Sequence, residues 1–263
     1  MIYPIEYISH SRLEMFRKNP MLYKKTYIDK VTEKTSSPAM MLGSLVHSML
    51  LEPATVDEKF AVAPICDKRT KAGKEAFEEF QKSLKPEMMI VTHDDIQQAN
   101  RMIAAINENS ASGYFLNSPC IVKEKEILTE VVFDAEPIKV KFICDAYCPE
   151  NNWVLDLKTT ASYDVFDWGK DCVFNGYFRQ LALYRFCLRS MQIPIRDCYH
   201  IVCDKGEYPT SMVVQFDTSD IDRSENQVFE TIRKFIESHR TGIFQPVHYG
   251  IVPKVTAPAW SWR

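Results

Sequence analysis

Three strand-like segments follow one another in the middle of the chain and limit the folds open to it. Residues 121–133, 137–147 and 152–158 are rich in β-branched and aromatic side chains, and the tetrapeptide "DAEP" between the first two is typical of a hairpin turn. Helical patterns precede these segments, and the order helix, strand, strand, helix follows them. The sequence therefore predicts an α/β protein with a central mixed sheet flanked by helices and a helical N-terminal part.

The flanking elements carry their own start and stop signals. Thr92 and Asp95 form a capping-box pattern, and Gly242 stands just past the last helical pattern. Helices are predicted over about 9–27 (interrupted near Asn19–Pro20), 38–51, 72–84, 92–106, 172–191 and 221–240, and further strands over 198–203 and 211–217. No repeat or Gly/Ser-rich linker divides the chain. A single domain over 1–263 is expected, mainly helical over 1–115 and sheet-containing over 116–263.

Composition excludes some classes of function. Hydrophobic residues make up 46% of the 263 residues and charged residues 25%, which is ordinary for a soluble globular protein. The net charge of −3 argues against nucleic-acid binding by bulk positive charge alone. The 8 glycines form no G-x-G-x-x-G or G-x-x-x-x-G-K loop, so a phosphate-cradling small-molecule site is not indicated. Neither a membrane span nor a secretory signal is apparent, so a cytoplasmic location is expected.

The eight cysteines form no C-x-x-C pair, and several stand in apolar runs. Buried, reduced thiols are therefore expected, and no iron–sulfur cluster.

Chemistry-bearing residues gather where the strand-like segments end. In "WVLDLKTT" (153–160), Asp156 and Lys158 point to one face of an extended strand and Leu157 to the other. The pair could be a surface ion pair of little energetic worth. The apolar residues before it and the threonines after it favour an interior strand end that lines a cleft.

Acidic residues on the two preceding strands support the cleft. Asp145 ends the second strand, and the first carries Glu124 and Glu126. Carboxylates brought together at neighbouring strand ends repel one another unless a cation lies between them. Oxygen ligands predict Mg²⁺, with Mn²⁺ as a substitute, and Lys158 could hold a water or offset charge on a phosphate. Glu124 and Glu126 share strand parity, so the pattern does not separate them; the spacing to Asp145 favours Glu126.

The pattern Glu126…Asp145…Asp156-Leu157-Lys158 resembles the PD-(D/E)XK nuclease superfamily. The surrounding features resemble its RecE-like (exonuclease VIII) exodeoxyribonucleases of phage and prophage origin, related to the RecB nuclease domain. Four further stretches carry the likeness: "ISHSRLEMFRKNPMLYKKTY" with its Ser-x-Ser segment, "MLGSLVHSMLLEP" with its Gly-x-x-x-His helix, "DLKTT", and "RQLALY" with its Gln-x-x-x-Tyr helix.

This resemblance implies a restriction-endonuclease-like core and a set of site residues. It implies that His47, Glu126, Asp145, Asp156 and the Leu157 carbonyl hold the metal and that Lys158 is catalytic. It also implies that Gln180, Tyr184 and Ser11 contact DNA or support the site. Gln180 and Tyr184, four residues apart, share one helix face, and Tyr177 extends that face.

The activity that the resemblance implies is 5′→3′ exonuclease action on double-stranded DNA in a bacterial host cell. The single strands produced would pass to an annealing protein during recombination, and the enzyme would be a ring-like homo-oligomer. The lead-in "KFICD" departs from the pattern because an apolar residue replaces an expected arginine, which Lys139 or Lys141 could replace.

Other interpretations remain open from the residues alone. His47 could be a hydrogen-bonded core histidine, and Asp145 a turn residue. The basic run 67–75 could be a solvated face or could follow a DNA backbone, and the tail "APAWSWR" could dock on the fold or on a neighbouring subunit. An endonuclease or single-strand exonuclease would share the same site. A catalytically silent DNA-binding or assembly module would share only the fold.

Overall fold

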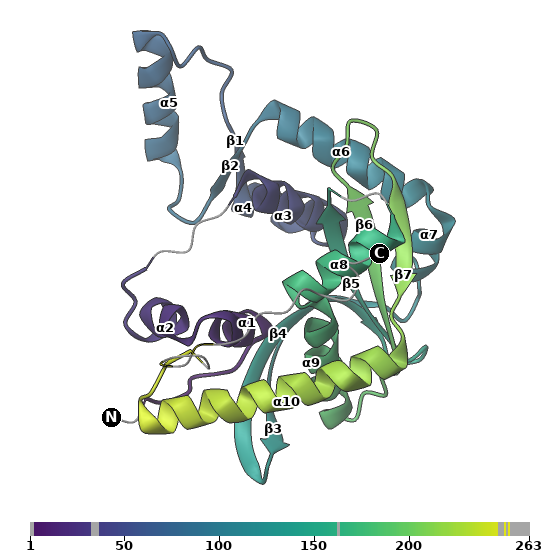
Figure 1. Cartoon of the computed structure of the whole chain (residues 1–263). Coiled ribbons are helices and arrows are strands. Elements are labelled where there is room, and N and C mark those ends of the chain that lie inside the picture. The colour runs from purple at the N-terminus through teal and green to yellow at the C-terminus, as the bar shows by residue number, and fades with distance from the viewer. Residues whose placement is uncertain (1–2, 33–36, 162–163, 247–249, 251, 253–263) are drawn as a thin grey trace.

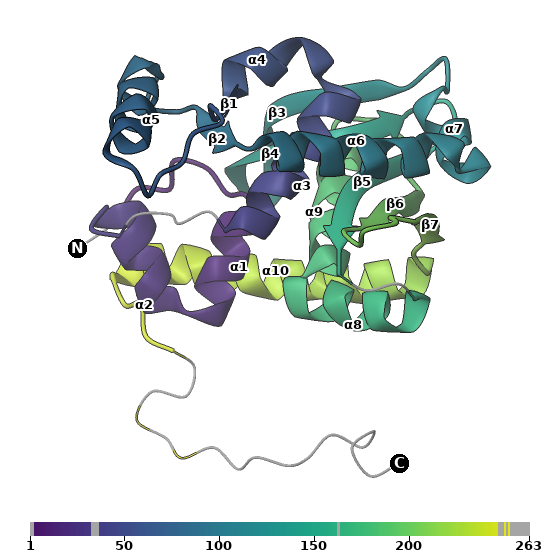
Figure 2. The same cartoon turned by 90° about the horizontal axis from the view of Figure 1, so that it is seen from above.

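A five-stranded mixed sheet with helices on both faces forms the centre of the protein (Figures 1 and 2). The computed structural model describes residues 3–32, 37–161, 164–246, 250 and 252. In the order of the sheet, the strands are β3 (Val122–Phe133), β4 (Glu136–Cys148), β5 (Trp153–Thr160), β6 (Asp197–Asp204) and β7 (Ser211–Gln215). The predicted α/β class and the chain order of the five strands of this sheet are confirmed.

Strand pairing places β5 in the interior. The β3–β4, β4–β5 and β6–β7 pairs are antiparallel, whereas β5 and β6 are parallel. Parallel neighbours require a crossover, which α8 (Val165–Asn175) and α9 (Tyr177–Ser190) provide. Six of the eight residues of β5 are buried, and only Lys158 and Thr159 are partly exposed. The "DLK" tripeptide therefore lies at the end of a buried central strand.

Each face of the sheet has its own hydrophobic core. One core contains buried residues of α1 (His10–Lys18), α9 and α10 (Thr218–Thr241) against β3 and β4. The other contains buried residues of α3 (Pro38–Leu51), α6 (His93–Glu108) and α7 (Ser110–Leu116) against β5 and β6. The result is a three-layer arrangement in which α3 carries His47 towards the sheet.

Local capping signals set several helix ends. Ser9 caps α1, and Thr92 and Asp95 form the reciprocal capping box of α6. Helix α3 spans the predicted range, and α10 ends at Gly242, whose φ of +77° suits the left-handed C-terminal cap. The predicted capping box at Thr92, the helix over 38–51 and the stop at Gly242 are confirmed, because the responsible contacts lie within a few residues.

The prediction of one helix over 172–191 is wrong, because two helices cover this range. The chain breaks at Gly176, whose φ is +76°, so that α8 and α9 meet there at an angle. A β-carbon on Gly176 would lie 2.7 Å from both the Arg179 guanidinium and the Glu14 carboxyl carbon. Glycine therefore serves as the C-terminal cap of α8 and admits the close approach of α1. The N-terminal segment is broken as expected, with α2 (Pro20–Tyr23) followed by a π-helical turn, Lys24–Ile28.

Residues 53–91 form more structure than the sequence indicates. A short 3₁₀ turn, Pro53–Thr55, and α4 (Val56–Lys59) lead into β1 (Phe60–Val62), which pairs in parallel with β2 (Met89–Val91). The intervening α5 (Lys71–Ser83) projects from the body, and only Gly73 in it is buried. We call residues 63–88 the α5 arm.

The cysteine prediction requires one correction. Cys120 and Cys148 are joined by a disulfide with their Cα atoms 5.7 Å apart, so these two are not free thiols. The remaining six are free, and five of them are buried. Among the described residues, no helix is long and apolar enough to span a bilayer.

Candidate active site

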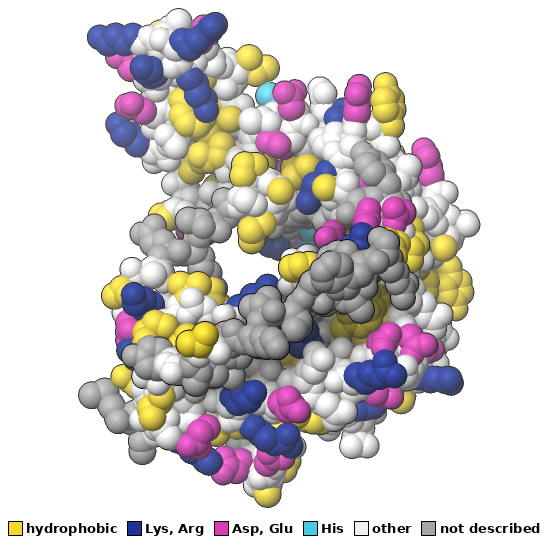
Figure 3. Space-filling view, viewed as in Figure 1, with side chains coloured by type: hydrophobic (Ala, Val, Ile, Leu, Met, Phe, Trp, Pro, Cys, Tyr) yellow, Lys and Arg dark blue, Asp and Glu magenta, His cyan; other side chains and the backbone are white. Residues whose placement is uncertain are grey.

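A cleft of about 810 Å³ opens where α3 faces the ends of β3, β4 and β5. In Figure 3, basic and acidic side chains surround a hollow near the middle of the molecule. The charged groups and the imidazole that line the cleft belong to His47, Glu52, Lys59, Glu124, Glu126, Asp145, Lys158 and Lys205.

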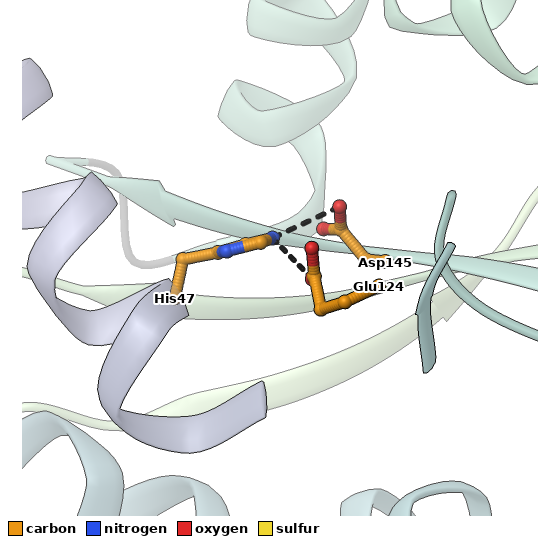
Figure 4. Close-up of side chains that lie close together, drawn as sticks. All are labelled: His47, Glu124 and Asp145. Carbon is orange, nitrogen blue, oxygen red and sulfur yellow. Dashed lines mark ion pairs between the residues drawn. The ribbon is translucent and has the colours of Figure 1, made fainter. Parts of the chain in front are cut away.

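His47 lies between two carboxylates (Figure 4). Its Nε2 atom is 2.9 Å from Glu124 Oε1 and 2.9 Å from Asp145 Oδ1. One ligand atom from each of the three residues lies within 4.8 Å of the others. His47 comes from α3, Glu124 from β3 and Asp145 from β4, so the cluster depends on the complete fold.

Asp145 also connects this cluster to the "DLK" strand end. Its Oδ2 atom accepts a hydrogen bond of 2.6 Å from the backbone N–H of Leu157. Asp156 is 1% exposed and forms an ion pair with the Lys158 ammonium group, as their shared strand face predicts. The structure thus brings together five of the predicted residues: His47, Asp145, Asp156, Leu157 and Lys158.

Helix α9 supports the strand end from the other side. Gln180 Nε2 lies 3.4 Å from Asp156 Oδ1 and donates to the Tyr184 hydroxyl at 2.8 Å. The Lys158 ammonium lies 4.9 Å from the centre of the Tyr177 ring. The predicted strip of Tyr177, Gln180 and Tyr184 therefore faces Asp156 and Lys158, and Tyr177 lines the cleft itself.

Of the two glutamates on β3, Glu124 contacts His47, whereas Glu126, which the spacing to Asp145 favours, does not. Glu124 has a φ of +46°, which breaks the alternation of side chains along β3. From Ile127 onward the buried residues follow regular alternation, and Glu126 points outward to Lys141, 3.0 Å away. Side chains of an ideal strand alternate between its two faces, and this alternation is broken at Glu124. Glu126 nevertheless lines the rim of the cleft.

Ser11 lies in a neighbouring recess and not in the main cleft. This recess, of about 290 Å³, also contains His10, Lys141, Gln180 and Tyr184. The Ser11 hydroxyl is 3.2 Å from that of Ser9. Ile143 lines both the recess and the main cleft, so the two hollows adjoin.

The electrostatics of the cluster favour a cation. Burial alone would lower the pKa of His47, but its hydrogen bonds to Asp145 and Glu124 raise that pKa to about 10. Burial, together with the charge of Asp145, raises the pKa of Asp156 to about 6. Burial would also lower the pKa of Lys158, but the charges of Asp156 and Asp145 raise it. In the metal-free protein a proton on His47 offsets the carboxylate charge.

The donor set fits a divalent metal. Two carboxylates and one imidazole converge, and a third carboxylate, Asp156, lies next to them on β5. Carboxylate oxygens suit Mg²⁺ and Mn²⁺, and the imidazole nitrogen favours Mn²⁺ more than Mg²⁺. A metal would replace the proton that His47 holds between Glu124 and Asp145.

Two cleft lysines were not anticipated. Lys59, at the end of α4, forms an ion pair with Glu52. Lys205 follows β6, and burial lowers the pKa of its side chain. No local pattern singles out either residue. Their position depends on how α4 and β6 pack beside β5.

This combination of a mixed sheet, clustered strand-end carboxylates and a neighbouring lysine defines a PD-(D/E)XK nuclease-like protein. The chain belongs to the family described as "PDDEXK-like domain of unknown function (DUF3799)", which matches residues 9–253.

One solved structure shares the fold, and a second aligns only weakly. A protein from Eubacterium rectale described as "Putative exonuclease" aligns with a TM-score of 0.64 and 17% identity, over 98% of this chain and 92% of that chain. A "phage related exonuclease" from Haemophilus somnus 129PT aligns over 67% of this chain and 88% of that chain, with 14% identity and a TM-score of 0.33. Only the first alignment supports a common fold. Among curated proteins, none matches the sequence.

Proposed function

We propose that the protein is a metal-dependent exonuclease that hydrolyses phosphodiester bonds in linear double-stranded DNA. The observation that carries this proposal is the convergence of His47, Glu124 and Asp145 with the Asp156-Leu157-Lys158 strand end in one cleft. Lys205 adds positive charge to the same cleft, which suits a phosphate backbone, whereas the charge of Lys59 is offset by its ion pair with Glu52.

The proposed metal ligands are His47, Glu124, Asp145, Asp156 and the Leu157 carbonyl, with Glu124 in the place first given to Glu126. Bound Mg²⁺ would polarise the scissile phosphate and lower the pKa of a water molecule. The water oxygen forms a bond to phosphorus as the bond from phosphorus to the 3′ oxygen breaks, and that oxygen takes up a proton.

Lys158 is proposed to act in its positively charged form. Because its pKa is raised, its side chain remains an ammonium at neutral pH and donates hydrogen bonds. It can orient the attacking water or offset negative charge that develops on the phosphate. Gln180 holds Asp156 in position from α9.

The direction of cleavage, the role in recombination and the oligomeric state are proposed from the motif resemblance. We propose 5′→3′ polarity, with the remaining single strand passed to an annealing protein for recombination, and action as a ring-like oligomer. A linear duplex labelled at one 5′ end or one 3′ end tests the polarity. Early release of the 5′ label as nucleotides supports it, and early release of the 3′ label contradicts it.

The same assay tests the chemistry. Cleavage should require Mg²⁺ or Mn²⁺, stop on addition of EDTA, and be absent in Asp156→Asn when circular dichroism shows that this variant is folded. Cleavage of closed circular duplex would replace the exonuclease assignment by an endonuclease. Duplex binding without cleavage in any divalent metal would favour a silent DNA-binding module.

A further inference from the structure

The disulfide between Cys120 and Cys148 lies close to the candidate metal site along both strands that it joins. Cys120 stands just before β3, in which Glu124 follows, and Cys148 ends β4, in which Asp145 precedes it. Glu124 and Asp145 are the two carboxylates that point to His47 from neighbouring strands (Figure 4). The cross-link therefore connects the backbone segments that position both carboxylates, although the proposed hydrolysis uses neither sulfur atom.

The pairing of β3 with β4 is interrupted at these two carboxylates. Glu124 stands opposite Asp145, and in the described register the two are flanked by pairs but do not themselves form one. The φ of +46° at Glu124 departs from the extended backbone that a ladder requires. On the side of the disulfide, two pairs remain: Val122↔Tyr147 and Lys123↔Ala146. A ladder end of two pairs frays readily unless another constraint holds it, and the disulfide is such a constraint.

The same end of β4 also holds β5. Three described pairs join these strands: Ala146↔Leu155, Tyr147↔Val154 and Cys148↔Trp153. Beyond them the Asp145 side chain, in place of a backbone carbonyl, accepts the hydrogen bond of the Leu157 N–H. Asp145 and Leu157 line the cleft, so the cleft begins where the β4–β5 pairing stops. The disulfide thus lies at the paired end of all three strands that form the metal site.

A positive φ in a glutamate persists only where the surrounding structure enforces it. We propose that Cys120 and Cys148 form a thiol–disulfide exchange site that sets the affinity of the cleft for a divalent metal. In the oxidised form, the cross-link holds the ladder end and keeps the Glu124 carboxylate on His47. In the reduced form, this end opens and Glu124 returns to extended backbone. Its side chain then shares the outward face of Glu126 and leaves His47. The inference rests on the proposed function, because that function supplies the metal.

The two sulfur atoms differ in their access to a reductant. Cys148 is fully buried, whereas Cys120 is partly exposed and lies beside the exposed Asn151. The co-reactant is a dithiol. One of its thiolates attacks Cys120 Sγ, the S–S bond breaks, and Cys148 leaves as a thiolate. The Ser118 hydroxyl, 3.9 Å from Cys148 Sγ, donates a hydrogen bond to that sulfur until it takes up a proton.

The second thiol of the reductant completes the exchange. It attacks the mixed disulfide and releases Cys120, which also takes up a proton. The dithiol is oxidised to a disulfide, and the protein gains two electrons and two protons. An oxidised dithiol reverses both steps and restores the cross-link.

Amide hydrogen exchange in EDTA tests the effect of the cross-link in the absence of metal. Reduction with dithiothreitol should accelerate exchange over 120–126 and 144–148 by roughly tenfold or more and leave α10 unchanged. Cys120→Ser/Cys148→Ser should match the reduced wild type and should not respond to dithiothreitol. Cys66→Ser is the matched control, because Cys66 is a partly exposed free thiol on the α5 arm. This control should respond as the wild type does.

Isothermal titration calorimetry with Mn²⁺ measures the consequence for the metal site. Reduction, followed by desalting without oxygen, should raise the dissociation constant of the wild type by about tenfold or more. Oxidised Cys66→Ser should bind as the oxidised wild type does, and Cys120→Ser/Cys148→Ser as the reduced one. Glu124→Gln should bind weakly in both redox states, because it lacks the carboxylate that the disulfide positions. Circular dichroism verifies that each variant is folded.

Three results would overturn the proposal. They are alkylation of both Cys120 and Cys148 after equilibration with an oxidised dithiol, equal amide exchange in the two redox states, and a dissociation constant that reduction leaves unchanged. A further tenfold loss of affinity on reduction of Glu124→Gln would contradict the part given to Glu124. If no form binds Mn²⁺, the proposed metal-dependent function is wrong, and the amide exchange alone decides whether the disulfide holds β3 and β4 together.

Discussion

Glu124 holds a backbone conformation that glutamate rarely adopts. A non-glycine residue with a φ of +46° costs about 1–3 kcal/mol, and such strain is concentrated at functional sites. Here the strain turns a carboxylate towards His47, whereas Glu126, in extended backbone, remains outside in an ion pair with Lys141. The unusual dihedral therefore separates two glutamates of the same strand.

The two glutamates should differ sharply on substitution. Glu124→Gln removes one of the charges that would hold the metal, so Mg²⁺-dependent cleavage should fall by about a hundredfold or more. Glu126→Gln should retain activity within a few-fold of the wild type. Initial cleavage rates at saturating Mg²⁺ measure both effects. If Glu126→Gln is the inactive variant, the ligand set proposed here is wrong.

His47 should make the stability of the metal-free protein depend on pH. Its pKa is about 10 in the folded state against an ordinary value of 6.5. The raised pKa therefore stabilises the fold fully below pH 6.5, and this contribution is lost as the pH rises towards 10. In EDTA, the free energy of unfolding of the wild type should fall by roughly 2–4 kcal/mol more than that of His47→Gln between these limits.

Urea unfolding at several pH values from 6.5 to 9 measures this difference. Comparison with His47→Gln cancels the contributions of groups common to both proteins. Parallel pH curves for the two proteins would show that His47 does not hold a proton between carboxylates.

The junction of α8 and α9 depends on one residue without a side chain. Gly176→Ala would place a β-carbon against Glu14 and Arg179 at a positive φ, so the free energy of unfolding should fall by about 1–3 kcal/mol. Gly113→Ala in α7 is the matched control, because its β-carbon would meet only Asn117 at 3.7 Å. Chemical unfolding of both variants measures the change. Equal stability of the two variants would contradict a strict requirement for glycine at 176.

Elements set by neighbouring residues could be predicted from the sequence, and elements set by distant contacts could not. The capping box at Thr92 and the stop at Gly242 are local, and the structure confirms them. The β1–β2 pair joins two three-residue strands far apart in the chain, so no local pattern indicates it. The continuous apolar pattern around Gly176 concealed the break between α8 and α9.

The candidate site shows the same division. Asp156 and Lys158 follow from strand alternation, and they do face the same side. The choice of Glu124 depends on a dihedral that nothing in its sequence neighbourhood encodes. Cys120 and Cys148 meet only because β3 and β4 bring them together, so their disulfide was missed.

At the scale of the whole molecule, the α5 arm projects from the body of the protein (Figure 1), and it contributes to neither core. Replacing residues 66–86 by a short Gly/Ser linker should therefore change the melting temperature by only a few degrees. Because this segment carries Lys68, Arg69, Lys71 and Lys74, duplex affinity should fall and should depend less steeply on salt concentration. Fluorescence anisotropy with labelled duplex at several salt concentrations measures both. An unchanged salt dependence would show that the arm does not contact the DNA backbone.

The parallel pairing of β5 with β6 has a consequence for protein synthesis. Strand β5 carries Asp156 and Lys158, yet its partner β6 ends only at Asp204, after α8 and α9 have passed over the sheet. Pairings between distant segments form slowly, because the loop between them must close first. A ribosome-bound chain that has exposed the "DLK" motif still lacks the strand that buries it and the Gln180 that holds its aspartate. The cleft is therefore assembled only when most of the polypeptide has been made, and an incomplete product lacks part of it.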